Sequence, residues 1–421
     1  MDFKKFFSNK KRNIIFIILA ALLLLDLILG LVCRHIIDDL DDQQTAKRWE
    51  TDGRAAQVSL FYTEDQMVTY EDIRKLEYNM EKKMHDAGII EDVDDEGSGS
   101  SSSKIVDTKP VGKKETSNSD SNNEEETVEE EPKIYNSCYS AQGICSLEFE
   151  NRKAENVDAI GVGGDFFLFH PMELVSGGYF WGDDLMKDKI VIDEYLAWQV
   201  FGSSDIIGQC VTISGVNHYI AGVVKSPTGR FNKAAGLSRC IVYMSYDSMA
   251  RYGTILSGRT SDVEISEDGA KMQSGGINCY EVVMPDPVEG IAARIVKESS
   301  GLEDKYICVV DNTNRFNGFA LYDVIRGFGI RSMWTQPIFY PYWENVARGW
   351  EDVLGLLFLF RIICKVAFWL IVASLVIVAY RNKTWTVKGI VMDLADRKYE
   401  FEARRRLKKQ ELPEITDKDQ K

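Results

Sequence analysis

The sequence predicts a mixed α/β fold of the α+β class, held outside the cytoplasm on two transmembrane α-helices. Apolar runs at residues 14–33 and 353–380 predict the helices, because each can cross a hydrocarbon core of roughly 30 Å. Short strand-like runs that alternate with helical stretches and glycine-containing turns predict the mixed domain between them, at residues 34–352.

The first apolar run is interrupted only by Asp26. Its roughly fifteen Leu, Ile, Phe and Val residues contribute about −0.3 to −0.6 kcal/mol each, which outweighs about +3 kcal/mol for one central aspartate. A charged start followed by an apolar run also fits a cleaved signal peptide. The run is longer than usual for such a peptide and no small-x-small cleavage site follows it, so we predict a retained anchor.

Lysine and arginine residues beside the two runs set their orientation. The N-terminal segment 1–13 is rich in lysine and arginine, whereas four of the five residues at 38–42, just after the first run, are aspartates. After the second run, basic residues recur through the tail, residues 381–421. Both termini are therefore predicted to be cytoplasmic, at the cell membrane, with the large domain outside.

Within the external domain, residues 57–62 predict a strand, and residues 69–88 predict a helix that Thr69 caps and Gly88 ends. Residues 91–133 are polar, acidic and nearly free of aromatic residues, so they predict a disordered insert. Residues 279–310 read as strand–helix–strand, whereas the FFLF run after residue 165 reads as strand.

Six of the eight cysteines fall in the external domain, and this even number fits disulfide use on an oxidising side of the membrane. The candidate disulfides are Cys138 with Cys145, across a turn containing Gly143, and Cys240 with Cys279, where two strand-like runs begin. The alternative is buried free thiols, because cysteine is a common core residue.

Asp26 is a candidate for an intramembrane pair, because an ionisable group inside a span is costly and usually has a partner. Lys365 lies near the outer end of the second span, as Asp26 does in the first. We therefore predict an Asp26–Lys365 pair between the helices. The alternative is that Asp26 reaches toward headgroups or water.

In the tail, four apolar residues recur at helical spacing and precede a basic cluster. They predict an amphipathic helix beneath the membrane, suited to membrane lipid or to docking on a cytoplasmic ATPase. A solvated basic tail that merely obeys the charge rule is the alternative. The four residues are Val387, Ile390, Val391 and Leu394.

No set of residues for catalysis stands out in the sequence. Motifs of the GxxxxGK[ST], GxSxG, HExxH and paired CxxC types do not occur, and the four histidines have no metal-ligand spacing. His170, in an aromatic run, is predicted to be a packed core or turn histidine, and GVGGD at residues 161–165 lacks the third glycine of a dinucleotide loop. We expect no enzyme activity, cofactor or metal in this chain, and its acidic surface argues against nucleic acid.

Two stretches of the external domain follow a recognisable pattern, GVGGDFFLFHPMELVSGGYF and KIVIDEYLAWQVFGSSDIIGQCVTISGVNHYIAGVV. They resemble the periplasmic core domain of MacB-type ABC transporter permeases. A later stretch, RFNGFALYDVIRGFGIRSMWTQPIFYPYWENVARGWEDVLGLL, is similar to the stalk that enters the second membrane helix of MacB-like proteins. The resemblance covers residues 55–380 without the insert. Turn positions of the pattern are held by Gly202, Gly208, Gly215 and Gly222.

The resemblance implies a permease-like, mechanotransmission subunit of a MacB/FtsX-type system, in which a separate cytoplasmic ABC ATPase hydrolyses ATP. Such permeases normally have three helices after the core domain, whereas this sequence has one span there. Either another chain (a multispan permease or a second copy of this chain) supplies the missing helices, or this is an accessory subunit. The alternative function is a membrane-anchored binding or signalling module without an ATPase; a cell-wall or disulfide enzyme is the least supported function.

Overall fold

The computed structural model describes residues 10–50, 53–89, 134–182, 184–235, 240–257, 275–331, 336–381 and 387–410. The chain divides into two compact units. One unit combines Met1–Leu31 with Leu359–Lys421, and the other is Val32–Phe358, the mixed domain. The predicted disordered insert, residues 91–133, lies outside the described residues.

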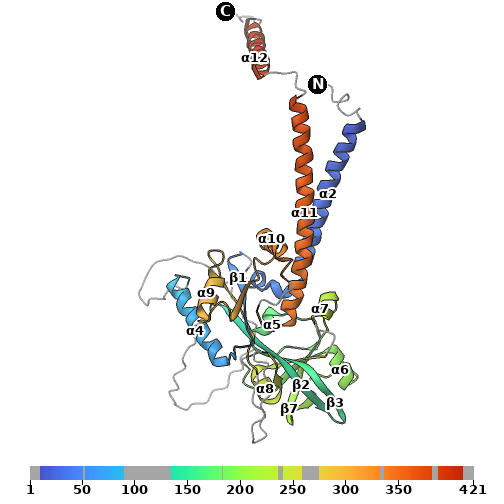
Figure 1. Cartoon of the computed structure of the whole chain (residues 1–421), viewed down its shortest axis with the longest axis vertical. Helices are drawn as coiled ribbons and strands as arrows, with labels where there is room; N and C mark the ends of the chain where they lie inside the picture. Colours follow the sequence, from blue (N-terminus) through green and yellow to red (C-terminus); the bar gives the residue numbers. More distant parts are fainter. Residues whose placement is uncertain are drawn as a thin grey trace, which may run out of the picture. The chain divides into compact units, whose positions relative to one another are not determined.

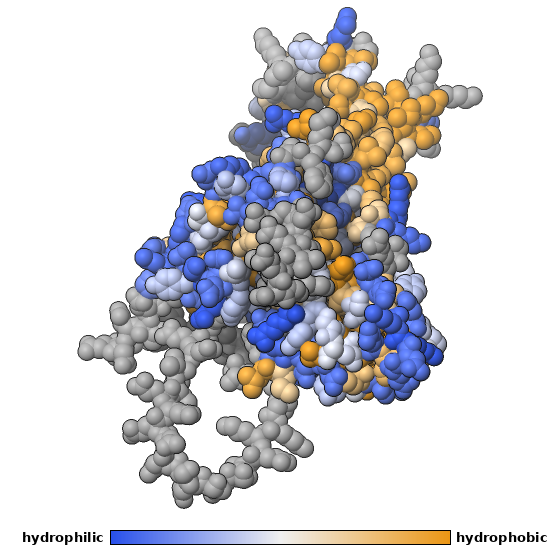
Figure 2. Space-filling model, turned by 60° about the horizontal axis from the view of Figure 1, so that its bottom comes forward, coloured by the Kyte–Doolittle hydropathy of each residue, from blue (hydrophilic) through white to orange (hydrophobic). Residues whose placement is uncertain are grey.

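Two long helices, α2 (Lys10–Asp38) and α11 (Tyr342–Arg381), contain stretches apolar enough to cross a membrane, Asn13–Asp38 and Tyr342–Val378. Only 6% of the most apolar window of each stretch is buried, whereas the core helix of a soluble domain would be mostly buried. Figure 2 shows apolar surface gathered over the long helices and mainly hydrophilic surface over the mixed domain. The tail forms a further helix, α12 (Val387–Gln410).

The mixed domain is built on an eleven-stranded sheet of parallel and antiparallel strands, so the predicted fold class is confirmed. The main path runs β11–β1–β10–β2–β3–β8–β5–β7–β4, while β6 pairs with β2 and β7, and β9 pairs with β2. The strands are β1 (Ala55–Tyr62), β2 (Asn136–Phe149), β3 (Arg152–Gly164), β4 (Leu174–Gly177), β5 (Lys189–Asp193), β6 (Cys210–Ile213), β7 (Val216–Val224), β8 (Ile241–Ser245), β9 (Thr254–Ile255), β10 (Cys279–Pro285) and β11 (Ile307–Asp311).

A split strand–helix–strand unit forms one end of the sheet. Strand β1 lies between β10 and β11 and runs antiparallel to both, so β10 and β11 are parallel to one another. Helix α9 (Ile291–Ser299) connects them, as the sequence pattern predicts. Beside α9 lies α4 (Tyr70–Asp86), which begins with a capping box between Thr69 and Asp72 and packs on α9 (Figure 1).

Among the described residues, the domain has two main hydrophobic cores and a third, minor cluster of Cys33, Leu321 and Leu354. The larger contains the apolar faces of α4 and α9, and the predicted helical spacing of residues such as Met80 and Met84 places them there. The smaller core contains Phe166, Phe169 and Trp343, and Trp343 belongs to the first turn of α11. The remaining helices are η1 (Asp41–Gln43), α3 (Thr45–Trp49), α5 (Phe166–Phe169), α6 (Glu194–Val200), α7 (Arg230–Ala234), α8 (Tyr246–Tyr252) and α10 (Gly318–Gly327).

The FFLF run forms the one-turn helix α5, so its prediction as strand is wrong. Strand β3 ends at Gly164, whose φ of 64° turns the chain out of the extended conformation. A side chain is excluded at this position, because an added Cβ would lie 2.4 Å from the carbonyl oxygen of Ser137. The turn sends Phe166 and Phe169 into the smaller core.

Both predicted disulfides are wrong, because the four cysteines carry free thiols. Cys138 and Cys145 lie on the same strand, β2, and seven residues of extended chain separate them by about 23 Å. Cys240 precedes β8 and Cys279 begins β10, with β2 and β3 between those strands. Disulfides require Cα atoms within about 7 Å. Burial raises the pKa of the Cys138 and Cys279 thiols well above the usual value.

Candidate functional site

In the helical unit, Asp26 has a different partner from the predicted Lys365. The Arg361 Nε lies 3.1 Å from the Asp26 Oδ1, and both side chains are largely shielded. Arg361 precedes Lys365 by one helical turn, about 6 Å along α11. Gly30, one turn after Asp26, leaves room for the guanidinium, since an added Cβ would lie 3.2 Å from the Arg361 Nη2.

We expect Asp26→Leu to lower the stability of the helical unit by about 1–3 kcal/mol, because it leaves Arg361 without its carboxylate inside a membrane span. The double variant Asp26→Leu with Arg361→Leu should recover most of the loss. Lys365→Leu is the matched control and should leave stability nearly unchanged. Thermal unfolding of the full chain in mild detergent measures all four proteins; equal losses for Asp26→Leu and Lys365→Leu would contradict this pairing.

The predicted docking face lies at the start of α12, whose first two turns contain Val387, Ile390, Val391 and Leu394. The Leu394 side chain is 62% exposed. The helix is thus present where the spacing predicts it, and docking on a partner stays a prediction.

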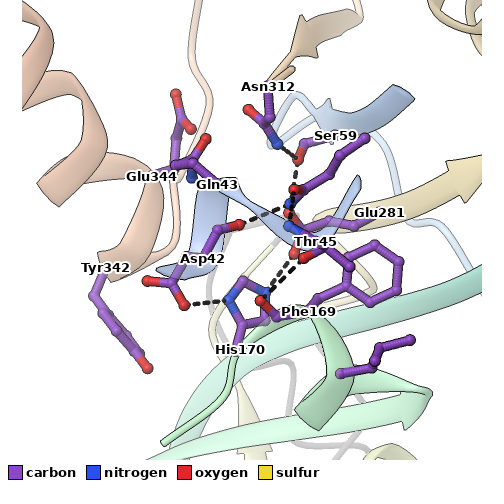
Figure 3. Close-up of polar contacts among 12 residues, drawn as sticks. Asp42, Gln43, Thr45, Ser59, Phe169, His170, Glu281, Asn312, Tyr342 and Glu344 are labelled. Atoms are coloured by element: carbon purple, nitrogen blue, oxygen red, sulfur yellow. Dashed lines mark hydrogen bonds and ion pairs between the residues drawn. The ribbon is translucent and has the colours of Figure 1, made fainter. Parts of the chain in front are cut away.

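The mixed domain contains a buried chain of polar side chains, which we call the ionic network. It runs from the segment that follows α2, through the sheet, to α11 (Figure 3). Eight side chains carry it, and most are almost fully buried. They are Asp42, Ser59, His170, Glu281, Asn312, Arg315, Glu344 and Glu351.

His170 lies between two carboxylates at one end of the ionic network. Its Nδ1 is 3.0 Å from the Asp42 Oδ1, and its Nε2 is 2.5 Å from the Glu281 Oε2. The second Glu281 oxygen accepts a hydrogen bond from the Ser59 hydroxyl at 2.6 Å, and Asn312 donates to that hydroxyl at 2.7 Å. His170 is a packed core histidine, as predicted, and it is also an ion-pair partner.

The charges around His170 favour the imidazolium. Burial alone would lower the pKa of His170, because a charged ring is poorly solvated in the core. Glu281 and Asp42 outweigh burial and raise this pKa to about 9. At neutral pH the ring is therefore protonated and links the segment after α2 to strand β10.

Cys138, His170 and Glu281 also form a compact set of metal-type donors, with ligand atoms within 4.8 Å of one another. Zinc accepts sulfur, imidazole and carboxylate ligands of this kind. Both ring nitrogens of His170 already face carboxylates, however, and burial keeps the Cys138 thiol protonated by raising its pKa. The protonated ring can donate one hydrogen bond to each carboxylate, so the geometry fits ion pairing better than a metal centre.

Arg315 joins the sheet to α11 at the other end of the ionic network. Its Nη1 and Nη2 donate to the two Glu344 oxygens at 2.7 and 2.8 Å, a bidentate pair. Its Nε donates to Glu351, two turns further along α11, and Nη1 reaches Asn312 at 3.3 Å. The Arg315 and Glu344 side chains are only 3% and 1% exposed.

These buried charges stabilise one another. Burial would lower the pKa of Arg315, but Glu344 and Glu351 outweigh it and raise this pKa. Burial would raise the pKa of Glu344, but Arg315 and Arg348 outweigh it and lower this pKa. Both groups therefore stay charged, and the start of α11 is held by charge as well as by the packing of Trp343 against the His170 ring, at 4.3 Å between centroids.

A cavity of about 450 Å³ lies beside the ionic network. Its lining comes from the segment after α2, the loop at residues 225–229 with α7, and the first turns of α11. Trp343 and Trp350 form an aromatic part of the cavity wall, and Asp39 and Lys225 add charged side chains to it. The indole nitrogen of Trp343 is buried and has no hydrogen-bond partner within the described residues.

Sequence reasoning missed most of the ionic network. Two signals were present: Glu281 interrupts an apolar strand-like run, and Glu344 and Glu351 are seven residues apart, which places them on one helix face. Arg315 and Asp42 carry no local signal, because each stands in a short polar segment among other polar residues.

Comparison with known proteins identifies the domain. Residues 88–274 match the family of MacB-like periplasmic core domains. This part of the chain is therefore a MacB-like periplasmic core domain, and the chain also has two helices that are long and apolar enough to cross a membrane. The resemblance seen in the sequence is confirmed.

Two solved structures are similar to this chain. The periplasmic region of MacB from Actinobacillus actinomycetemcomitans shares 13% identity at a TM-score of 0.33, over 66% of this chain and 94% of that one. The extracellular domain of the noncanonic ABC-type transporter YknZ from Gram-positive bacteria shares 14% identity at a TM-score of 0.32, over 60% of this chain and 99% of that one. Among proteins with curated functions, none matches this chain in sequence.

Proposed function

We propose that this protein is a permease-like, mechanotransmission subunit of a MacB/FtsX-type ABC transporter system. ATP is hydrolysed by a separate cytoplasmic ATPase, both chain termini are cytoplasmic, and the mixed domain acts on a substrate or partner outside the cell membrane. The family of the core domain supports this proposal, because MacB-like domains occur in ABC transporter permeases.

The observation that carries the proposal is the attachment of α11 to the sheet. α11 is a single helix, Tyr342–Arg381, whose first turns are held in the mixed domain by Arg315 and Trp343. A rigid helix clamped by buried charges transmits displacement along its axis, because its hydrogen-bonded backbone resists compression. The segment after α2 is clamped to the same network through Asp42.

The proposal assigns ATPase docking to the first turns of α12. A tagged full chain is solubilised gently, and copurifying proteins are identified by mass spectrometry. An ABC ATPase should copurify with the wild-type chain, and its recovery should fall at least tenfold when Val387, Ile390, Val391 and Leu394 are all replaced by glutamate. Met392→Glu is the matched control, because Met392 lies on another side of the helix and is as exposed as Leu394, 61% against 62%.

Each outcome distinguishes a different failure. Equal recovery of the ATPase with the fourfold variant would reject the docking face and keep the transporter role. Isolation without any ATPase would reject the transporter role and favour the alternative, a membrane-anchored binding module. The cavity beside Trp343 and Trp350 is the observation that favours this alternative, since it offers aromatic wall and charge to a ligand.

A further inference from the structure

Helix α10 (Gly318–Gly327) has one buried face and one exposed apolar face. Leu321 and Val324 are 5% and 9% exposed, whereas Phe319 and Tyr322 are 87% and 53% exposed. Burial of a phenylalanine side chain contributes about 1.5–3 kcal/mol, and here most of that contribution is unrealised within the chain. An exposed apolar face of this kind marks a surface that contacts something else.

The buried face of α10 packs on the parts of α2 and α11 that belong to the mixed domain (Figure 1). Leu321 shares a small core with Cys33 of α2 and Leu354 of α11. Cys33 is the last residue of the apolar run at residues 14–33, and Leu354 lies at the start of the run at residues 353–380. α10 therefore packs on α2 and α11 beside the ends of both apolar runs.

The exposed side of α10 has the composition of a membrane-interface anchor. Phe319, Tyr322 and Arg326 follow one another at helical spacing, and Ile330 extends the same line beyond the helix end. Aromatic residues gather at the headgroup level of bilayers, and arginine extends its charge to water while its stem covers apolar surface. The exposed Asp323 suits the polar headgroup layer.

Lipid is the occupant that the neighbouring surface favours. Val32 of α2 and Leu356 of α11 are 42% and 46% exposed within the mixed domain, although both are apolar. They belong to stretches that are long and apolar enough to cross a membrane. Val32 and Leu356 are one and two residues in the chain from Cys33 and Leu354, on which α10 packs, so exposed apolar surface suited to hydrocarbon continues along both helices from the place where α10 is attached.

We propose that α10 is a membrane-interface helix whose Phe319–Tyr322 face lies in the outer leaflet of the bilayer. Helices of this type bury their apolar face about 5–10 Å into the boundary between headgroups and acyl chains. By packing on Leu354, α10 fixes the depth at which α11 leaves the membrane. The proposal rests on the membrane placement of α2 and α11 and does not depend on the transporter function.

Photocrosslinking of the full chain tests this placement. The variant Phe319→p-benzoylphenylalanine is reconstituted in nanodiscs of phosphatidylcholine and phosphatidylglycerol, irradiated, and analysed by mass spectrometry. The control is Tyr78→p-benzoylphenylalanine, because Tyr78 is 68% exposed on α4, which packs on α9. Both positions are exposed, so the substitutions should not affect folding.

We expect lipid adducts at position 319 at a yield at least tenfold above position 78. Equal yields at the two positions would overturn the proposal, because they would reflect random collision with lipid. Absence of lipid adducts at position 319 would overturn it too. Crosslinks from position 319 to a second copy of the chain, in place of lipid, would identify a protein interface and likewise reject the proposal.

Discussion

Arg315→Met is expected to lower the free energy of unfolding of the mixed domain by about 3–5 kcal/mol, the usual cost of removing one partner of a buried ion pair. The variant leaves Glu344 and Glu351 in the core, 1% and 10% exposed at their side chains, without the guanidinium that they face. Denaturant unfolding of the full chain in mild detergent, followed by tryptophan fluorescence, measures the change, because Trp343 and Trp350 report on this region.

A matched set of variants separates loss of the ionic network from the general effect of replacing an arginine. Arg294→Met removes an exposed arginine of α9 and should change stability by about 0.5 kcal/mol or less. Arg315→Lys keeps the charge but loses the bidentate geometry, so its loss should be intermediate. Adding Glu344→Gln and Glu351→Gln to Arg315→Met should recover part of the stability. Wild-type stability for Arg315→Met would show that the ionic network does not hold α11.

The stability of the mixed domain is expected to fall as the pH rises from about 6.5 through about 9. The pKa of His170 is raised from 6.5 to about 9 in the folded protein, against the effect of burial, by Glu281 and Asp42. A raised folded pKa means that the stabilisation is fully present below the unfolded value and is lost as the pH passes the folded value. The difference corresponds to about 3 kcal/mol.

Unfolding measured from pH 6 to pH 10 tests this assignment. His170→Gln should remove most of the decline, and Asp42→Asn should move its midpoint to lower pH, since it removes one of the two carboxylates. His218→Gln is the control, because His218 is also buried but burial lowers its pKa, the opposite direction to the shift of His170. A decline that persists unchanged in His170→Gln would assign the titration to another group.

If α11 moves, it must either break the ionic network or move the sheet with it. The Arg315 and His170 variants therefore also test how α11 is coupled to the sheet. Arg315 and His170 lie at opposite ends of one chain of contacts that passes through Asn312, Ser59 and Glu281. A weakened clamp at either end should let α11 shift without the sheet. Variants that remain folded can therefore separate the contribution of the ionic network to stability from its contribution to passing a displacement of α11 to the sheet.

The sequence alone determined several of the elements and the family of the core domain. Apolar runs fix α2 and α11, because the length and composition of a membrane span are local properties. The helix α4 follows from its cap at Thr69 and the spacing of its apolar residues, and the strand–helix–strand unit follows from local pattern and turns. The MacB-like resemblance was visible because turn positions and strand patterns are also local.

Only the tertiary structure decided which residues meet. Asp26 and Arg361 are 335 residues apart, and His170 and Glu281 are 111 apart, so no periodicity relates them. Strand order placed Cys240, just before β8, and Cys279, on β10, too far apart for a disulfide. Asp26 pairs with Arg361 and not with Lys365, although the two basic residues are only one helical turn apart on α11. Long-range pairs depend on register and strand order, which the packing of the whole chain sets.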